Sequence, residues 1–256
     1  MKQSVFVLFS MVIMVLAPLR SVAGNLDKMW DRANTAYVNG DYAGALAVYD
    51  SIESANKAGV KLYYNMGNAH FKSGHIGKAI LYYSKAQRLD PFDEDVEYNL
   101  QVAQGYVKDR IEVVPEFFAS RWLNDTRNAM SSNAWAVTSL VVLALALCGL
   151  LLYLLPLGMT YRKLGFWSVV LFGVLTIVSV TFASKQRSEA VESDDAVVML
   201  SAAPVKSSPD SSSKDIFVIH EGTMVKVLDH LGDWSQISIA DGNKGWILTS
   251  SIEIID

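Results

Sequence analysis

The chain has 256 residues, enough for two small domains with accessory segments. Its net charge of -4 and its pI near 5.6 provide no basic surface for nucleic acid. The single cysteine, Cys148, lies in an apolar run, so one chain forms neither a disulfide nor a paired-cysteine zinc or redox site. Hydrophobic residues make up 51% of the chain and gather in three blocks, a pattern typical of a membrane protein.

The first apolar block is at the N-terminus. Lys2 precedes an apolar stretch at residues 5–17, and residues 21–23 are small, as at a cleavage site. This pattern predicts a secretory signal peptide over residues 1–23. Arg20 leaves open the alternative that the segment stays uncut as an anchor. In either case the following segment is expected to be exported, and a lipoprotein anchor is excluded because no cysteine follows the block.

Residues 26–110 contain two copies of a helical pattern. In the second copy, Gly67, Ala79 and Ala86 are small enough for two antiparallel helices to approach closely. Gly74 can take the positive φ at which the first helix ends, and Pro91 ends the second helix. A weaker copy lies 34 residues upstream, with its matching residues at Gly40, Ala45 and Tyr49.

This pattern resembles the tetratricopeptide repeat, which implies an all-α repeat domain over residues 26–110. A further helix from Asp95 is expected to act as a cap or as a degenerate third repeat. In this family the first helix of each repeat lines a concave groove. The resemblance therefore implies a partner-binding groove formed by Trp30, Asn34, Tyr37, Tyr64, Asn68, Phe71, Lys72 and Tyr98.

Aromatic rings with amide and ammonium groups suit an extended peptide or a partner helix. The alternative for each aromatic residue is packing between helices. A clamp for a C-terminal carboxylate, which some members of the family form with Asn and Lys, is not expected here. Trp30 stands at the position of the first Lys, and the cap offers Tyr98 and Val102 in place of basic residues.

Two transmembrane helices are predicted at residues 134–155 and 164–184, which carry no charge and are long enough to cross a hydrocarbon core of about 30 Å. Residues 111–133 are interpreted as a linker. The connecting residues 156–163 carry only basic charges, as expected of a cytoplasmic loop. Because the chain crosses twice, both soluble parts are expected on the periplasmic side of a bacterial inner membrane.

After a linker at residues 185–195, residues 196–256 contain short β-rich runs that alternate apolar and polar side chains. These runs fall at residues 197–199, 216–219, 224–228, 234–239, 245–248 and 252–254. Five or six such strands predict a small all-β barrel. The segments 221–223, 232–234 and 245–247 resemble a bacterial SH3-like domain with a variable loop at residues 207–214.

Trp234 and Trp246 are candidate surface residues of this SH3-like domain, although packing in the barrel core is the preferred interpretation. Residues 204–206 read Pro-Val-Lys where the family often has Asn-Val-Arg, which weakens any inherited ligand site. Twelve acidic and six basic residues over 185–256 argue against binding of anionic glycans or nucleic acid.

No catalytic pattern is found in the sequence. It contains neither a GxSxG nucleophile elbow nor HExxH spacing, and the segment 74–79 lacks the spacing and the Ser/Thr of a phosphate loop. We therefore expect neither an enzyme nor a metal or other cofactor.

The whole order of segments resembles the BatE type of the Bacteroides aerotolerance proteins, which are encoded with von Willebrand A-type membrane proteins and a MoxR-like ATPase. This resemblance implies a non-enzymatic inner-membrane scaffold in an envelope complex linked to oxygen or stress tolerance. The alternative is a cell-wall sensor that binds peptidoglycan peptides through the SH3-like domain. A third interpretation is a subunit that targets a wall hydrolase.

Overall fold

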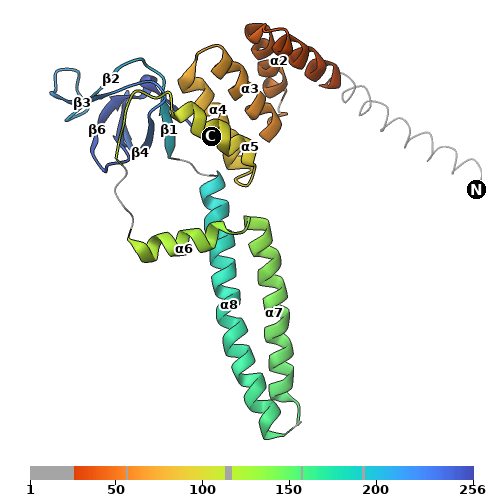
Figure 1. Cartoon of the computed structure of the whole chain (residues 1–256). Helices are drawn as coiled ribbons and strands as arrows, with labels where there is room; N and C mark the ends of the chain where they lie inside the picture. The colour runs from red at the N-terminus through yellow and green to blue at the C-terminus, as the bar shows by residue number, and fades with distance from the viewer. Residues whose placement is uncertain (1–25, 56, 113–116, 157, 192–193) are drawn as a thin grey trace, which may run out of the picture. The chain divides into compact units, whose positions relative to one another are not determined.

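The computed structural model describes residues 26–55, 57–112, 117–156, 158–191 and 194–256. One compact unit combines the chain up to Ile111 with Asp194–Ile255, and a second unit contains Glu112–Ser193. Helical repeats, two long apolar helices and an antiparallel β region are all present, so the predicted fold class is confirmed (Figure 1). The predicted signal peptide lies outside the described residues.

The helical part of the first unit begins with a helix at residues 26–38. It continues with α2 (Tyr42–Ser54), α3 (Val60–Lys72), α4 (Ile76–Leu89) and α5 (Glu94–Gln104). The two repeats end their first helices in the same way, because Gly40 and Gly74 have φ values of 79° and 78°. The Asp93 carboxylate caps α5 by accepting hydrogen bonds from the backbone N–H groups of Asp95 and Val96.

The close approach of α3 and α4 depends on Gly67. A Cβ atom at this position would lie 2.5 Å from Cδ1 of Tyr83, which is almost completely buried. Ala79 and Ala86 are completely buried on α4. The small residues therefore do what the repeat pattern predicts.

The β region of the same unit is a seven-stranded antiparallel sheet in the order β3-β2-β6-β5-β4-β1-β7. Its strands are β1 (Asp195–Val198), β2 (Ala203–Lys206), β3 (Asp215–Ile219), β4 (Met224–Leu231), β5 (Trp234–Ser238), β6 (Lys244–Leu248) and β7 (Ile252–Ile254). Strand β2 was not predicted from the sequence, because its four residues include Pro204 and form no clear alternating run. The expected variable loop at residues 207–214 connects β2 to β3.

The sheet also continues the core of the repeats. Leu81 of α4 and Leu100 of α5 are buried in one cluster with Val197 of β1 and with Ile255. Helix α5, expected as a cap or a degenerate third repeat, packs against α4 through Leu100 and Ala103. The sheet adds a further layer and covers the apolar surface that α4 and α5 would otherwise expose.

The second unit contains α6 (Phe118–Asn128), α7 (Ser132–Leu154) and α8 (Met159–Val191). Both α7 and α8 are long and apolar enough to cross a membrane, and only 17% and 6% of their most apolar windows are buried. Gly149 and Gly165 bring these two helices together, since a Cβ atom on Gly165 would lie 2.5 Å from the backbone nitrogen of Tyr153. Two segments interpreted as linkers are partly helical, because α6 lies within residues 111–133 and α8 extends through residues 185–191.

Candidate partner-binding surfaces

Three aromatic residues recur at 34-residue intervals on successive first helices of the repeat domain. Trp30 is half-buried with its ring 5.8 Å from that of Tyr49. Tyr64 is also half-buried, and its hydroxyl accepts a hydrogen bond of 2.7 Å from Nδ2 of Asn99. Tyr98 is 67% exposed. The first two rings are therefore partly engaged in the fold, whereas Tyr98 presents its ring to solvent.

The two asparagines predicted for the groove make the same contact in both repeats. The Tyr49 hydroxyl donates to Oδ1 of Asn34 at 2.9 Å, and the Tyr83 hydroxyl donates to Oδ1 of Asn68 at 2.7 Å. Burial raises the pKa of Tyr49 to about 12 and also raises the pKa of Tyr83, so both hydroxyls keep the proton that they donate. Each asparagine side chain is thereby held in one orientation.

The amide nitrogens of these asparagines have no hydrogen-bond partner among the residues that the structure describes. Asn34 is exposed and Asn68 is half-buried. Because the oxygen of each amide is already used, what each repeat offers to a partner is an N–H donor.

The remaining predicted groove residues divide into packed and exposed ones. Phe71 is half-buried, with its ring 5.3 Å from the ring of Tyr106 in an edge-on arrangement. Tyr37 packs in the same way against Tyr42, at 5.4 Å. Lys72, at the end of α3, is exposed. The alternative of packing between helices thus describes Phe71 and Tyr37, whereas Lys72 remains accessible to a partner.

A shallow hollow of about 510 Å³ lies beside the first helix and was not predicted from the sequence. It is lined by Asp31, Arg32, Thr35, Ala36, Asn39, Asp41, Gly44 and Val48. A second hollow on the same helix includes Asn34 and Val38. The first helix therefore adds a hollow next to Asn34 whose lining combines charged and polar side chains with apolar surface.

On the sheet, Trp234 and Trp246 lie on the face that points away from the core. Trp234 is paired with Leu248 and Gln236 with Trp246, while the alternate residues Ile237 and Ile247 are buried. Both tryptophans are half-buried. The preferred interpretation of these rings as barrel core is therefore wrong, since the smaller isoleucines occupy the inner positions of β5 and β6.

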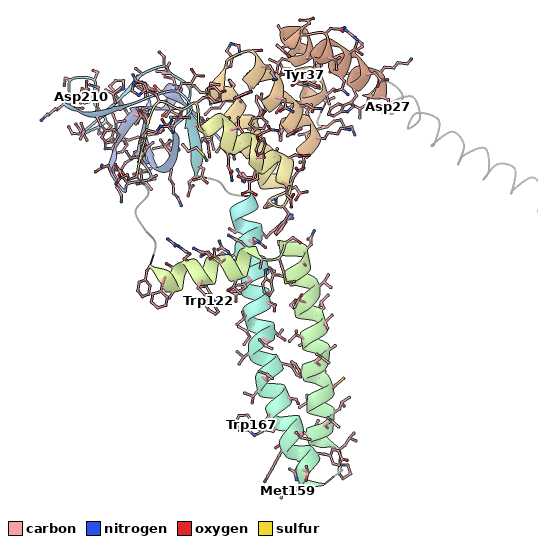
Figure 2. The ribbon with its side chains drawn as sticks, viewed as in Figure 1. Asp27, Tyr37, Trp122, Met159, Trp167 and Asp210 are labelled. Atoms are coloured by element: carbon pink, nitrogen blue, oxygen red, sulfur yellow. The ribbon has the colours of Figure 1, made fainter. Side chains whose placement is uncertain are left out.

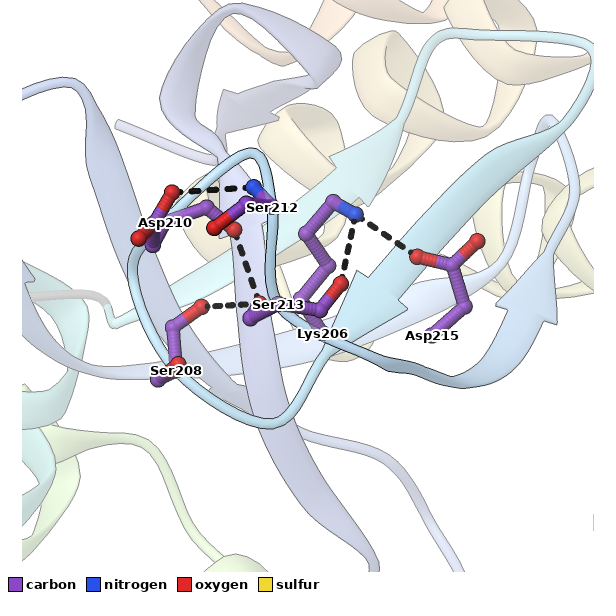
Figure 3. A network of polar contacts seen from close by, with 6 residues as sticks. All are labelled: Lys206, Ser208, Asp210, Ser212, Ser213 and Asp215. Atoms are coloured by element: carbon purple, nitrogen blue, oxygen red, sulfur yellow. Dashed lines mark hydrogen bonds and ion pairs between the residues drawn. The ribbon is translucent and has the colours of Figure 1, made fainter.

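The loop between β2 and β3 is closed by its own hydrogen bonds (Figure 3). Nζ of Lys206 donates to the carbonyl oxygen of Ser213 at 3.1 Å and to Oδ1 of Asp215 at 2.8 Å. The Ser213 hydroxyl donates to the carbonyl oxygens of Ser208 and Asp210. Hydrogen bonds from Ser212 keep the pKa of Asp210 below its ordinary value. The Lys206 charge next to Trp246 is thus paired within the domain.

A polar contact that the sequence did not predict fastens the sheet to the end of the repeats. The Asp109 carboxylate lies 2.6 Å from Nδ1 of His220 and accepts hydrogen bonds from the His220 backbone N–H and the Thr223 hydroxyl. Burial alone would raise the pKa of Asp109, but the bonds from Thr223 and His220 outweigh it and keep the pKa below its ordinary value. Asp109 and His220 are 111 positions apart in the sequence, and no local sequence pattern predicts their contact.

Among the described residues, no group of three or more His, Cys, Asp or Glu side chains is arranged so that it could bind a metal ion.

Comparison with protein families supports the predicted repeat region and the predicted SH3-like region. The tetratricopeptide repeat family matches residues 60–93, which contain α3 and α4. The bacterial SH3 domain family matches residues 201–253, from just before β2 into β7. A comparison with curated proteins finds no match to this chain. The repeat indicates protein–protein interaction and the SH3 domain indicates peptidoglycan-related binding, and both are typically non-catalytic modules.

Proposed function

We propose that this chain is a non-enzymatic adaptor of the bacterial inner membrane that holds a protein partner on its repeats. The observation that carries the proposal is the repeated contact of Asn34 with Tyr49 and of Asn68 with Tyr83. It fixes two amide N–H donors at equivalent positions of successive repeats. An extended peptide presents backbone carbonyl oxygens at regular spacing and is the natural acceptor for such donors.

Lys72 and Tyr98 extend this surface with a charge and an aromatic ring. Both are exposed, and Lys72 is four residues after Asn68 on the same helix. Residues three or four apart lie on the same helix face, so the ammonium group and the amide face the same ligand. We infer that the partner segment places an acidic or polar group next to Lys72 and an apolar side chain next to Tyr98.

Membrane anchoring through α7 and α8 is supported by their length and by how little of their apolar surface is buried. The repeats and the sheet share one core, so the chain before the hairpin and the chain after it need to be on the same side of the bilayer. Two crossings satisfy this requirement. Basic residues stand both at the turn (Arg162, Lys163) and beyond the other ends of the helices (Lys185, Arg187), so their charges alone do not decide the orientation. The predicted signal peptide favours export of the repeats, which leaves the repeats and the sheet in the periplasm.

The order of segments resembles the BatE type, and we propose that the partners are von Willebrand A-type membrane subunits of an envelope complex linked to aerotolerance or stress. A membrane-anchored adaptor whose repeats face the periplasm suits such a complex, because it can reach only exported segments of its neighbours.

The substitution pair Asn34→Asp and Asn68→Asp tests this proposal. An Asp oxygen still accepts the tyrosine hydrogen bond, but the amide donor is lost. Cross-linking in native membranes followed by mass spectrometry should then lose the partners captured by the wild-type chain, at unchanged abundance of the adaptor. Unchanged capture would overturn the proposal.

Two controls separate binding from folding. Tyr83→Phe removes the internal bond but keeps the Asn68 amide, so it should retain capture with some loss of stability. The pair Lys57→Ala and Phe92→Ala removes one charge and one exposed ring from the turns between repeats, away from the groove positions, and should capture the same partners.

A second function is favoured by the match to the bacterial SH3 domain and by the outward position of Trp234 and Trp246. In this alternative the chain is a cell-wall sensor that binds peptidoglycan peptides. The full chain should then sediment with purified sacculi, and Trp234→Ala with Trp246→Ala should prevent it. The full chain is needed because Val197 and Ile255 belong to the core shared with the repeats.

A further inference from the structure

Helix α6 divides its residues cleanly between an apolar and a polar side. At 100° per residue, one side contains Phe118, Ala119, Trp122, Leu123 and Thr126. The other side contains Ser120, Arg121, Asn124, Asp125, Arg127 and Asn128. The large side chains of the apolar side are exposed in the structure: Phe118 is 77% exposed, Trp122 67% and Leu123 49%. Such a surface is covered by something in the working protein.

Two side chains of the hairpin contact the end of α6 and the turn that follows it. Nε1 of Trp135 on α7 donates to the carbonyl oxygen of Arg127 at 2.8 Å. Nε2 of Gln186 on α8 donates to the carbonyl oxygen of Met130 at 3.0 Å and lies 3.4 Å from the carbonyl oxygen of Arg127. The C-terminal end of α6 is therefore tied to the start of α7 and to Gln186 of α8.

The end of the hairpin that contacts α6 is also the end of its apolar part. The apolar stretch of α7 begins at Ala134, after the polar Ser131, Ser132 and Asn133, and the charge-free stretch of α8 ends at Ser184, just before Lys185. In a bilayer, the change from apolar to charged residues marks the headgroup region. Figure 1 shows α6 running across the hairpin at this end rather than along it, and in Figure 2 Trp122 extends from α6 on the side toward which the hairpin runs.

We propose that α6 is an interfacial helix that lies in the plane of the membrane surface and inserts Phe118, Trp122 and Leu123 between the lipid headgroups. The inference rests on the proposed membrane anchoring of α7 and α8. Amphipathic helices with aromatic and leucine side chains on one face bind at this depth, and tryptophan is enriched there.

Lipid is favoured as the occupant over a second protein because the apolar side of α6 continues the lipid-exposed surface of the hairpin. The contacts of Trp135 and Gln186 hold the end of the helix at the boundary of the apolar part of the hairpin, and Arg121 and Asp125 on the polar side are exposed, as a surface toward water and headgroups requires.

Two neighbouring residues of α6 provide a matched test. Ala119 and Ser120 are both exposed and both small, but Ala119 falls on the apolar side of the helix and Ser120, about 100° further round, on the polar side. The full chain with Cys148→Ser receives either Ala119→Cys or Ser120→Cys, each labelled with the fluorophore NBD. The two proteins are reconstituted in phosphatidylcholine–phosphatidylglycerol vesicles that contain lipids with a spin label near the headgroup or deep in the acyl chain.

The label at position 119 should emit at shorter wavelength and be quenched severalfold more by the shallow spin label than the label at position 120. Position 120 should instead be quenched by aqueous iodide. Adding Phe118→Ser and Trp122→Ser should move the label at position 119 into water. These changes leave the hairpin contacts of Arg127 and Met130 intact.

Native Cys148, exposed on α7, serves as the internal reference. Labelled in the otherwise unchanged chain, it should be quenched most by the deep spin label. If Cys148 is quenched but positions 119 and 120 behave alike, the interfacial helix is overturned and the membrane anchor stands. A label at position 119 that is shielded from both lipid and iodide would overturn the proposal in favour of a protein contact. An unquenched label at Cys148 would overturn the anchor as well.

Discussion

The hydroxyl of Tyr83 on α4 donates a 2.7 Å hydrogen bond to Asn68 on α3, and the corresponding pair in repeat one makes the same bond. Tyr83 is almost completely buried, so its hydroxyl has no access to water if the acceptor is removed. The oxygen of the asparagine therefore supports the fold, which leaves its nitrogen as the donor that we propose binds a partner.

Asn68→Ala should lower the free energy of unfolding by about 1–3 kcal/mol, because a buried donor loses its acceptor. Tyr83→Phe in the same chain should recover part of this loss, since no unpaired hydroxyl remains. The measurement is chemical unfolding of the detergent-solubilised full chain, followed by circular dichroism. Equal stability of Asn68→Ala and the wild type would show that the bond contributes nothing.

Gly67→Ala should lower the free energy of unfolding by about 1–3 kcal/mol, because the added Cβ would lie 2.5 Å from a ring carbon of Tyr83. Gly59→Ala is the control, as its backbone is extended and a Cβ there meets nothing within 4 Å. Thermal melting compares the two. A melting temperature that falls equally in both variants would contradict the role assigned to Gly67.

Asp109→Ala should weaken the attachment of the sheet to the repeats, since His220 and Thr223 lose their shared acceptor. The expected loss is about 1–3 kcal/mol, with helix and sheet signals that no longer unfold together. Because the pKa of Asp109 is lowered in the folded chain, its contribution is present above its ordinary pKa. In the wild type it is lost as the pH falls below about 4, the ordinary carboxyl value.

A different pH range is predicted for His70. Burial is the main reason that the pKa of His70 is lowered to about 4; the nearby charges of His75 and Lys78 act in the same direction, and that of Glu253 opposes them. The folded chain thus favours the neutral ring, which stacks on Tyr82 at 5.3 Å. Stability should therefore decline as the pH falls from about 6.5 toward 4.

His70→Phe keeps the stacked ring but does not titrate, so it should flatten this pH dependence of the melting temperature. His75→Gln keeps the His70 ring but removes one of the charges that lower its pKa, so the decline should persist and end at a slightly higher pH. An identical decline in His70→Phe and in the wild type would assign the pH dependence to another group.

Single cysteines should reveal the orientation of the chain in Cys148→Ser protein. A membrane-impermeant maleimide added to spheroplasts should label Lys57→Cys on the repeats and Ser208→Cys on the sheet. Met159→Cys at the turn of the hairpin, where the residue is exposed, should react only after permeabilisation. The opposite labelling pattern would place the repeats and the sheet in the cytoplasm.

Much of this fold follows from regular spacing in the sequence. The 34-residue period predicts the turns at Gly40 and Gly74 and the close contact at Gly67, because each is fixed by local backbone geometry. Alternation also places Ile237 on the inner face of the sheet, which leaves Trp234 outside. The core interpretation of Trp234 followed the size of its side chain instead of this alternation, and it therefore assigned the ring to the wrong face of the sheet.

The parts that were missed depend on distant partners or on weak local signals. The shared core of Leu100 and Val197 joins segments separated by the whole hairpin, and nothing near either residue indicates the other. Helix α6 was interpreted as a linker because its charges are spread along the sequence, although they fall on one side once the helix forms. The second role of Asn68 likewise appears only when Tyr83 is seen beside it.

The core that spans both ends of the chain also sets an order of events during synthesis. Translation at roughly 5–20 residues per second means that the repeats emerge roughly 7 to 30 seconds before Ile255 completes their last layer. During that interval Leu81 and Leu100 lack the strand residues that bury them in the finished fold. Completion of the N-terminal repeats therefore waits for synthesis of the hairpin and of the final residues of the same chain.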